Sequence, residues 1–199
     1  MAGTGAAAVI TTVETRRAYI VLLACACCVL LVLPFVTSFN DLLTAGAMQL
    51  GIAGPLQSVA PLEVRMVVAV VNLVGIRAGA AGSQLVVWNS AGQPQTLFIS
   101  WNCVGWQSLV LLGLSLLSGL RGQYTTAARM QVALLGLTGT LCMNLLRITA
   151  VCLLAASLGR VPAILFHDYG GTLLTLAWLL LFWGLAYRWI LPEPGVGAA

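Results

Sequence analysis

Residues 130–158 read MQVALLGLTGTLCMNLLRITAVCLLAASL, and this stretch decides the class of fold. It is longer than the roughly 20 apolar residues that a helix needs to cross a bilayer. Its one charged residue is Arg147. A run of this length and composition is typical of a membrane-spanning helix, so we expect an integral membrane protein.

The composition of the whole chain agrees with this expectation. Hydrophobic residues make up 60% of the 199 residues and charged residues 7%, whereas soluble domains are about 25% charged. This excludes a soluble globular domain, a disordered tail and a nucleic-acid-binding protein. The nine positive charges are all Arg and are scattered along the chain, so we interpret them as determinants of membrane topology, not as a phosphate-binding patch.

Three other apolar runs, 18–36, 104–120 and 172–190, predict further spans and so a membrane-embedded domain over residues 18–190. Residues 1–17 are predicted to be a mobile cytoplasmic tail, and residues 191–199 a C-terminal tail. A cleaved signal peptide is the alternative for the first run. That run is long for a signal peptide, and no small-x-small cleavage site follows it promptly, so a retained helix is favoured.

Residues 40–101 are expected to form a cap on the outer surface. Gly, Pro and Gln interrupt residues 40–61, and residues 62–76 are short for a span and contain charges, which favours interfacial helices, although a double crossing stays open. The segments 83–88 (SQLVVW) and 96–101 (TLFISW) flank the turn-forming NSAGQP and predict a β-hairpin outside the bilayer core. The predicted fold is an all-α integral membrane helical bundle of about four spans, with interfacial helices and a small extracytoplasmic β-hairpin.

This topology brings three reactive side chains to one level. Cys103 begins a helix directly after the hairpin, and His167 lies in the predicted outer loop 159–171. Arg147 follows the start of its span by about 25 Å at 1.5 Å per residue, near the outer edge of the hydrocarbon core. The predicted inner side holds five of the nine arginines, a modest but consistent positive-inside bias: Arg16, Arg17, Arg121, Arg129 and Arg188.

The three side chains suit covalent acyl transfer. The N-terminal end of a helix stabilises a thiolate, which is the nucleophilic form of Cys103. An intramembrane arginine such as Arg147 can stabilise a thiolate or a tetrahedral oxyanion. A histidine such as His167 can accept and return a proton near neutral pH. We therefore expect amide cleavage through an acyl-enzyme at the outer membrane surface.

Structural explanations exist for each residue taken alone. Cys103 can be a packed thiol, and Arg147 can extend its guanidinium to the lipid headgroups. His167 with Asp168 can be a loop pair or a helix cap. Asn144, one turn before Arg147, either orients the guanidinium or makes a hydrogen bond between helices.

Taken together, the motifs resemble the exosortase/archaeosortase family. The resemblance rests on three elements in order, and it covers about residues 62–185. They are Asn102-Cys103-Val104-Gly105 at the opening of a membrane helix, Asn144-Leu145-Leu146-Arg147 late in a later helix, and His167 followed by Gly170-Gly171. The stretch from Gly75-Ile76-Arg77 into Cys103 also resembles the extracytoplasmic lead-in of that family.

The resemblance implies a multi-pass cysteine transpeptidase or peptidase of the cell membrane, with its site facing the extracytoplasmic side. Cys103 would form a thioester with the substrate, Arg147 would stabilise charge and His167 would act as general acid and base, with Asn144, Gly105 and Asp168 supporting them. The implied substrates are secreted proteins that end in a short motif, a transmembrane helix and a basic cluster. The acceptor would be a lipid, a glycan or water, and the other partners are membrane lipids.

No cofactor, metal or nucleic acid is expected. In particular, the single His and cysteines inside apolar runs argue against a structural zinc site. Two other functions stay open. A non-catalytic membrane assembly or scaffold subunit would bind through its outer cap, and a small transporter subunit would use Arg147 as a counter-charge for its solute.

Overall fold

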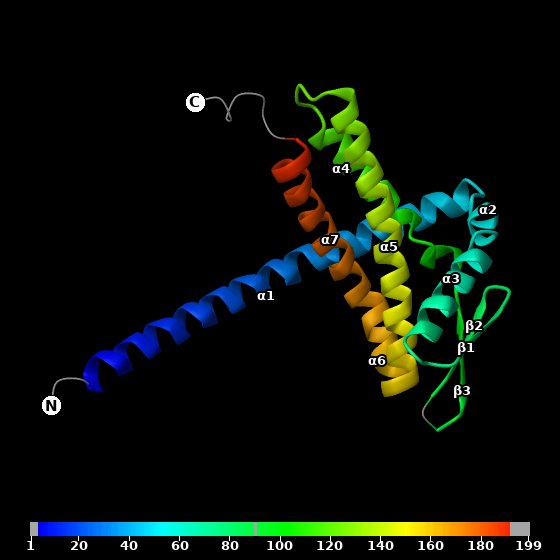
Figure 1. The fold of residues 1–199 in the computed structure, drawn as a ribbon, viewed down its shortest axis with the longest axis horizontal. Coiled ribbons are helices and arrows are strands. Elements are labelled where there is room, and N and C mark those ends of the chain that lie inside the picture. Colours follow the sequence, from blue (N-terminus) through cyan, green and yellow to red (C-terminus); the bar gives the residue numbers. More distant parts are fainter. Residues whose placement is uncertain (1–3, 90, 192–199) are drawn as a thin grey trace. The chain divides into compact units, whose positions relative to one another are not determined.

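The structure, a computed structural model, describes residues 4–89 and 91–191. The chain divides into a first unit, residues 1–41, and a second unit, residues 42–199. The described part of the first unit belongs to helix α1 (Thr4–Gln49). This helix contains the predicted span 18–36 and, from Thr4 on, the predicted tail 1–17. All other elements, labelled in Figure 1, belong to the second unit.

Helix α5 (Thr126–Leu158) is the central element of the second unit. The side chain of Thr125 caps its first turn by accepting a hydrogen bond from the Ala128 amide at 3.2 Å. Along its length α5 packs against α3 (Ala60–Leu73), α4 (Trp106–Gly119), α6 (Arg160–Leu165) and α7 (Gly171–Leu185). The predicted span 130–158 therefore forms most of the helix against which these four helices of the second unit pack (Figure 1).

Small residues on α5 let the last helix approach closely. A Cβ atom on Gly139 would lie 2.0 Å from the Trp178 indole of α7, so only glycine leaves room for that ring. The same indole donates its Nε1–H to the Thr140 hydroxyl at 3.0 Å. Close approach at small residues, joined by hydrogen bonds between helices, is typical of helix packing in membranes.

The prediction that residues 159–171 form a loop is wrong, because all of them except Gly159 are helical. Gly159 has a φ of 88°, and this left-handed residue reverses the chain at the end of α5. Pro162 lies in the first turn of α6, where its missing N–H costs no helical hydrogen bond. Helix α6 then continues through the π-helical turn η2 (Phe166–Gly170) into α7 and η3 (Ala186–Ile190). His167 therefore lies in a helix and not in a loop.

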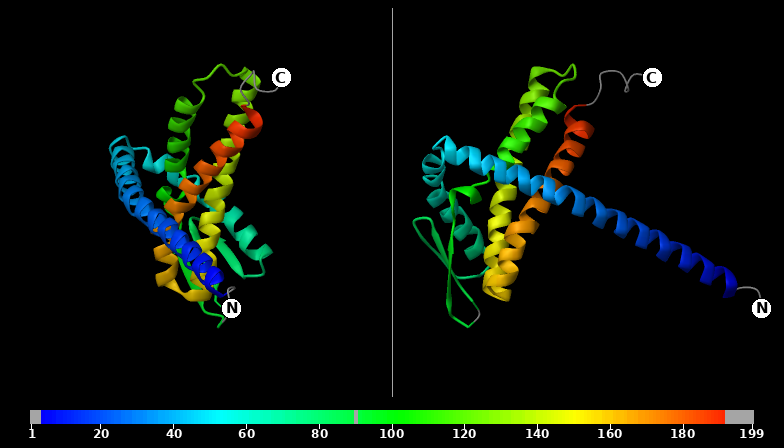
Figure 2. Two further views of the ribbon diagram at one scale, coloured as in Figure 1. Left: turned by 90° about the vertical axis from the view of Figure 1, so that its left-hand side faces the viewer. Right: turned by 180° about the vertical axis from the view of Figure 1, so that it is seen from behind.

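The predicted β-hairpin is present but belongs to a larger sheet. Strands β1 (Ala78–Ala81), β2 (Gln84–Trp88) and β3 (Pro94–Phe98) form an antiparallel sheet in that order. Leu85 and Val87 of β2 are fully buried against α3 and α5. The sheet and α3 therefore lie side by side beside the end of α5 that joins α6, as the views in Figures 1 and 2 show.

Two short helices connect α1 to the sheet. Gly51, with a φ of 69°, follows the end of α1, and α2 (Ala53–Gln57) and α3 come next. One face of α3 is buried by packing on the sheet and α5, whereas Leu62 and Met66 on the same helix are exposed.

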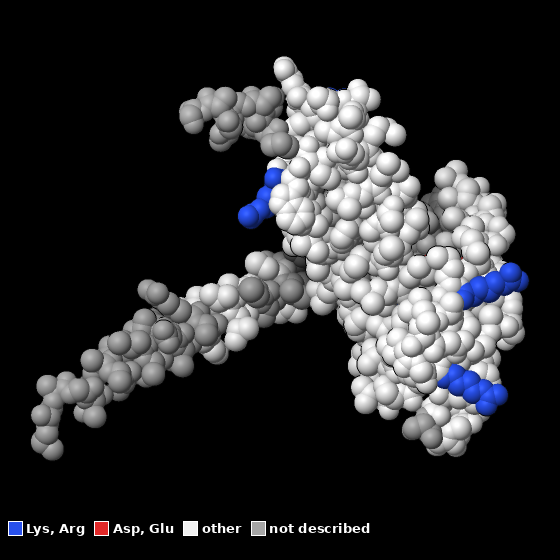
Figure 3. Space-filling view, viewed as in Figure 1, with Lys and Arg blue, Asp and Glu red and all other residues white. Residues whose placement is uncertain are grey.

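The described chain has four helical stretches that are long and apolar enough to cross a membrane: Ala53–Leu73, Trp101–Gly119, Thr126–Leu158 and Arg160–Ile190. The last three contain most of the predicted spans 104–120, 130–158 and 172–190. The first lies in the segment for which the sequence favours interfacial helices. Outward-facing leucines such as Leu117, Leu141 and Leu180 are exposed, and the face drawn in Figure 3 has only isolated basic side chains. These features are those of a multi-pass membrane protein.

Candidate active site

The turn that carries Cys103 lies between the sheet and α4. After β3, the Ile99 amide donates to the Ser83 carbonyl at 2.9 Å, which ties the chain to the sheet. The residues Trp101–Cys103 then form the single turn η1, in which the Cys103 amide donates to the Ser100 carbonyl at 2.8 Å. Cys103 thus precedes α4 and is partly buried, because the turn is held against the interior of the protein.

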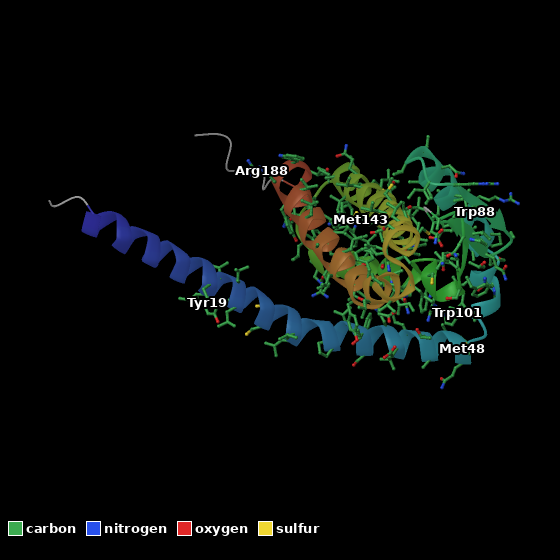
Figure 4. The ribbon with its side chains drawn as sticks, turned by 90° about the horizontal axis from the view of Figure 1, so that it is seen from below. Tyr19, Met48, Trp88, Trp101, Met143 and Arg188 are labelled. Atoms are coloured by element: carbon green, nitrogen blue, oxygen red, sulfur yellow. The ribbon has the colours of Figure 1, made fainter. Side chains whose placement is uncertain are left out.

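Gln57 of α2 fixes this turn from a distant part of the sequence. Its Oε1 accepts a hydrogen bond from the Trp101 amide at 2.7 Å, and its Nε2 donates to the Ile99 carbonyl at 3.3 Å. The indole of Trp101, labelled in Figure 4, stacks on that of Trp106 with ring centroids 6.0 Å apart. The backbone on the N-terminal side of Cys103 is therefore restrained by a side-chain amide and an aromatic stack.

Gly105 fixes the turn on its other side. Its φ of 77° is in the left-handed region, and a Cβ atom there would lie 2.7 Å from Cγ of Asn144. Both observations require glycine at this position. The spacing of Cys103 and Gly105 therefore has a structural cause, because the glycine lets the chain enter α4 while Asn144 approaches the turn.

The imidazole of His167 lies between the Cys103 thiol and a carboxylate. Its Nε2 is 3.5 Å from Cys103 Sγ, and its Nδ1 is 3.0 Å from Asp168 Oδ1. A neutral imidazole that donates Nδ1–H to Asp168 presents Nε2 as an acceptor to the thiol. The three side chains therefore have the order nucleophile, base and orienting carboxylate. The His167 side chain is 40% exposed and that of Asp168 54%, so this pair is open to solvent.

Ser100 is a polar neighbour of the thiol that is not among the residues predicted from the sequence. Its Oγ lies 3.5 Å from Cys103 Sγ. The hydroxyl can donate to sulfur in the thiolate form or accept from the thiol. A serine at the end of a predicted strand carries no specific signal, so only the folded chain reveals this contact.

Arg147 holds the turn that bears His167. Its Nη2 donates to the His167 backbone carbonyl at 3.0 Å, and it interacts electrostatically with Cys103, Asp168 and Glu63. A Cβ atom on Gly171 would lie 2.0 Å from Arg147 Nε, so this glycine makes room for the guanidinium. The structure thus brings Arg147 to the site, with its hydrogen bond directed to the histidine turn.

Asn144 and Glu63 form a buried polar pair behind the cysteine turn. Asn144 Nδ2 donates to the Cys103 carbonyl at 3.0 Å and also to Glu63 Oε1 of α3. Of the two roles expected for Asn144, the hydrogen bond between helices is the one observed. Glu63 is 8% exposed, and within the described chain its Oε2 has no hydrogen-bond partner.

Glu63 is also absent from the residues predicted for the site, because its segment is interpreted from the sequence as an interfacial helix. An acidic residue inside an apolar helix is itself a functional signal, and that signal could have identified it.

A cavity of about 430 Å³ opens beside the thiol. Cys103, His167 and Asp168 line it, together with all residues of 95–99, side chains of α5, and Arg160 and apolar side chains of α6. Arg147 does not line the cavity. Among the described residues, no group of three or more His, Cys, Asp or Glu side chains could hold a metal ion. The cavity therefore offers a thiol, an imidazole, a carboxylate and the Arg160 guanidinium beside apolar side chains and one strand.

Comparisons with known protein families, with curated proteins and with solved structures find no match for this chain.

Proposed function

We propose that this chain is an exosortase-like cysteine transpeptidase or peptidase of the cell membrane, which cleaves the C-terminal sorting signals of secreted proteins. The observation that supports this most is the contact between Cys103 Sγ and His167 Nε2, at 3.5 Å in a cavity large enough for a peptide segment. The order of the three motifs, which resembles that of the exosortase/archaeosortase family, supports it independently.

In the proposed reaction, His167 Nε2 takes the proton of the Cys103 thiol, and the sulfur attacks the carbonyl carbon of the scissile amide. The tetrahedral intermediate collapses to a thioester as the imidazolium gives its proton to the departing amine. An amine or hydroxyl of a lipid or glycan, or water, then attacks the thioester and releases the thiol. Asp168 orients the imidazole through Nδ1, and Arg147 supplies positive charge near the reacting atoms.

We place the site on the extracytoplasmic side. The loop between α4 and α5 and the end of the last helix lie together, because the Tyr187 hydroxyl donates to the Gly119 carbonyl at 3.2 Å. Arg121, Arg129 and Arg188 belong to this end. Cys103 and His167 instead line the cavity between β3, α5 and α6. Arg65 lies in α3, Arg77 directly before β1 and Arg160 at the start of α6. With Arg16 and Arg17, which the predicted topology also puts inside, the end with Arg121, Arg129 and Arg188 has five of the nine arginines, and this modest bias favours it as the cytoplasmic end.

The proposal is tested by co-expressing the chain with a tagged secreted protein that ends in a short motif, an apolar helix and an Arg-rich tail. Cys103→Ala is expected to abolish removal of the tail while the protein still inserts in the membrane. Cys142→Ala is the matched control, because Cys142 is an exposed cysteine on α5, and it is expected to process normally. Unchanged processing by Cys103→Ala would overturn the proposal.

A further inference from the structure

Strand β3 has an open edge. It is the last strand of the sheet order β1-β2-β3, and among the described residues it pairs with β2 alone. The Asn89 amide donates to the Gln93 carbonyl at 3.0 Å, and the Ile99 amide to the Ser83 carbonyl at 2.9 Å. Antiparallel pairs alternate between bonded and non-bonded, so Pro94, Thr96 and Phe98 are the β3 residues whose backbone groups point away from β2.

This open edge borders the cavity that contains the thiol. Residues 95–99 line that cavity without a gap. Successive side chains of a strand point to opposite faces, so an unbroken run of lining residues means that the backbone edge itself faces the cavity. The opposite wall includes Val151 and Ala155 of α5 and Ile164 of α6.

We infer that β3 binds the extended segment around the scissile bond of the substrate as a fourth, added strand. The backbone N–H and C=O groups of Thr96 and Phe98 would pair with the peptide, and the cavity would take its alternate side chains. This inference rests on the proposed function, and it names how that site recognises a peptide. The chain leaves β3 at Phe98 and turns through η1 to Cys103, so a peptide along this edge leads its carbonyl toward the thiol.

The sequence of β3 limits the pairing to a short window. Pro94 at the start of the strand has no N–H, so the edge offers donors only from Thr96 onward. An open edge is a hazard for aggregation, and proline is one device that protects it. Main-chain hydrogen bonds recognise an extended backbone and depend little on its side chains. Pairing over a few residues therefore suits substrates that share a short extended motif directly before an apolar helix.

The first test removes one outward donor and leaves the sheet bonds in place. Thr96→Pro deletes an N–H that β2 does not use, and an edge strand tolerates this change. We expect about a five- to ten-fold slower processing of the tagged secreted protein at low substrate expression, from the loss of one hydrogen bond. Thr96→Ala keeps the N–H and is expected to slow processing less than Thr96→Pro does. Ala80→Pro, at an outward position of the opposite edge strand β1, is the second control.

Labelling of Cys103 by N-ethylmaleimide in membranes, measured in chains whose exposed cysteines Cys27, Cys28 and Cys142 are replaced by alanine, reports whether the site of each variant is intact. Normal processing by Thr96→Pro, with labelling preserved, would overturn the inference and leave the proposed function standing, provided that Cys103→Ala remains inactive. Normal processing by Cys103→Ala would instead overturn the proposed function.

A second measurement does not depend on a proline. A photo-crosslinking amino acid at Phe98, a residue that is 60% exposed, is placed in the Cys103→Ala chain. We expect it to capture the uncleaved substrate, whereas the same group at Ala80 does not. Equal capture from both positions, or capture from neither, would contradict binding at β3.

Discussion

Replacement of Gly105 by alanine tests whether the geometry of the cysteine turn controls activity. The glycine has a φ of 77°, and the new Cβ atom would lie 2.7 Å from Asn144 Cγ and 2.9 Å from its Nδ2. A non-glycine residue in the left-handed region costs roughly 1–2 kcal/mol. Displacing Asn144 also weakens its hydrogen bond to the Cys103 carbonyl, which costs about another 1 kcal/mol.

The sum, about 2–3 kcal/mol of stability, is small enough for Gly105→Ala to fold at reduced temperature. The cleavage rate of the folded protein is also expected to fall, because a misplacement of about 1 Å in a reacting group costs on the order of 100-fold in rate. Two assays separate these effects in detergent-solubilised protein: the melting temperature and the rate at which the tagged secreted protein is cleaved.

Gly113→Ala is the matched control, since Gly113 lies in α4 and a Cβ atom added there would meet nothing within 4 Å. It is expected to leave processing unchanged and to stabilise the helix by roughly 0.5–1 kcal/mol. If Gly105→Ala melts and processes like the parent chain, this glycine does not position Cys103.

Other residues around the site give three more predictions. Glu63→Ala removes an acceptor from a buried amide and is expected to lower stability by about 1–3 kcal/mol, whereas Glu63→Gln keeps an acceptor and most of the stability; equal melting of the two would contradict this. Asp168→Asn removes the carboxylate that orients His167 and is expected to slow processing by about 10- to 100-fold, with membrane insertion unchanged. The decrease is limited because the His167–Asp168 pair is open to solvent. An unchanged cleavage rate would show that Asp168 does not orient the imidazole. Gly171→Ala would place a Cβ atom 2.0 Å from Arg147 Nε and is expected to impair processing. Gly184→Ala, where a Cβ atom meets nothing within 4 Å, is expected to leave processing unchanged. Equal effects of the two substitutions would show that Gly171 is not needed to make room for the guanidinium.

The coarse fold could be predicted because length and hydropathy dominate in a membrane chain. The run 130–158 is unbroken and apolar, and it forms most of α5. The segments around Val86 and Leu97 combine β-branched and aromatic residues with a polar turn, and they form β2 and β3. Strand β1 was missed because its sequence, AGAA, has no β-forming residue. These residues form a strand because they pair with the free edge of β2.

The helical turn that carries His167 could not be predicted from its composition. Gly159, Pro162 and Gly170 are common in loops, yet the first reverses the chain and the second fits a first helical turn. The pairing of Asn144 with Glu63 joins residues 81 positions apart. Contacts of this kind depend on how helices pack, and a single sequence contains no local signal for them.

The central claim is that Cys103 forms a thioester with the cleaved substrate. Hydroxylamine attacks thioesters, so its presence during processing converts the acyl fragment to a hydroxamate, which mass spectrometry identifies at the new C-terminus. We predict that the parent chain releases this hydroxamate at the sorting signal and that Cys103→Ala releases none. Release of the same fragment by Cys103→Ala at the parent rate would contradict the claim.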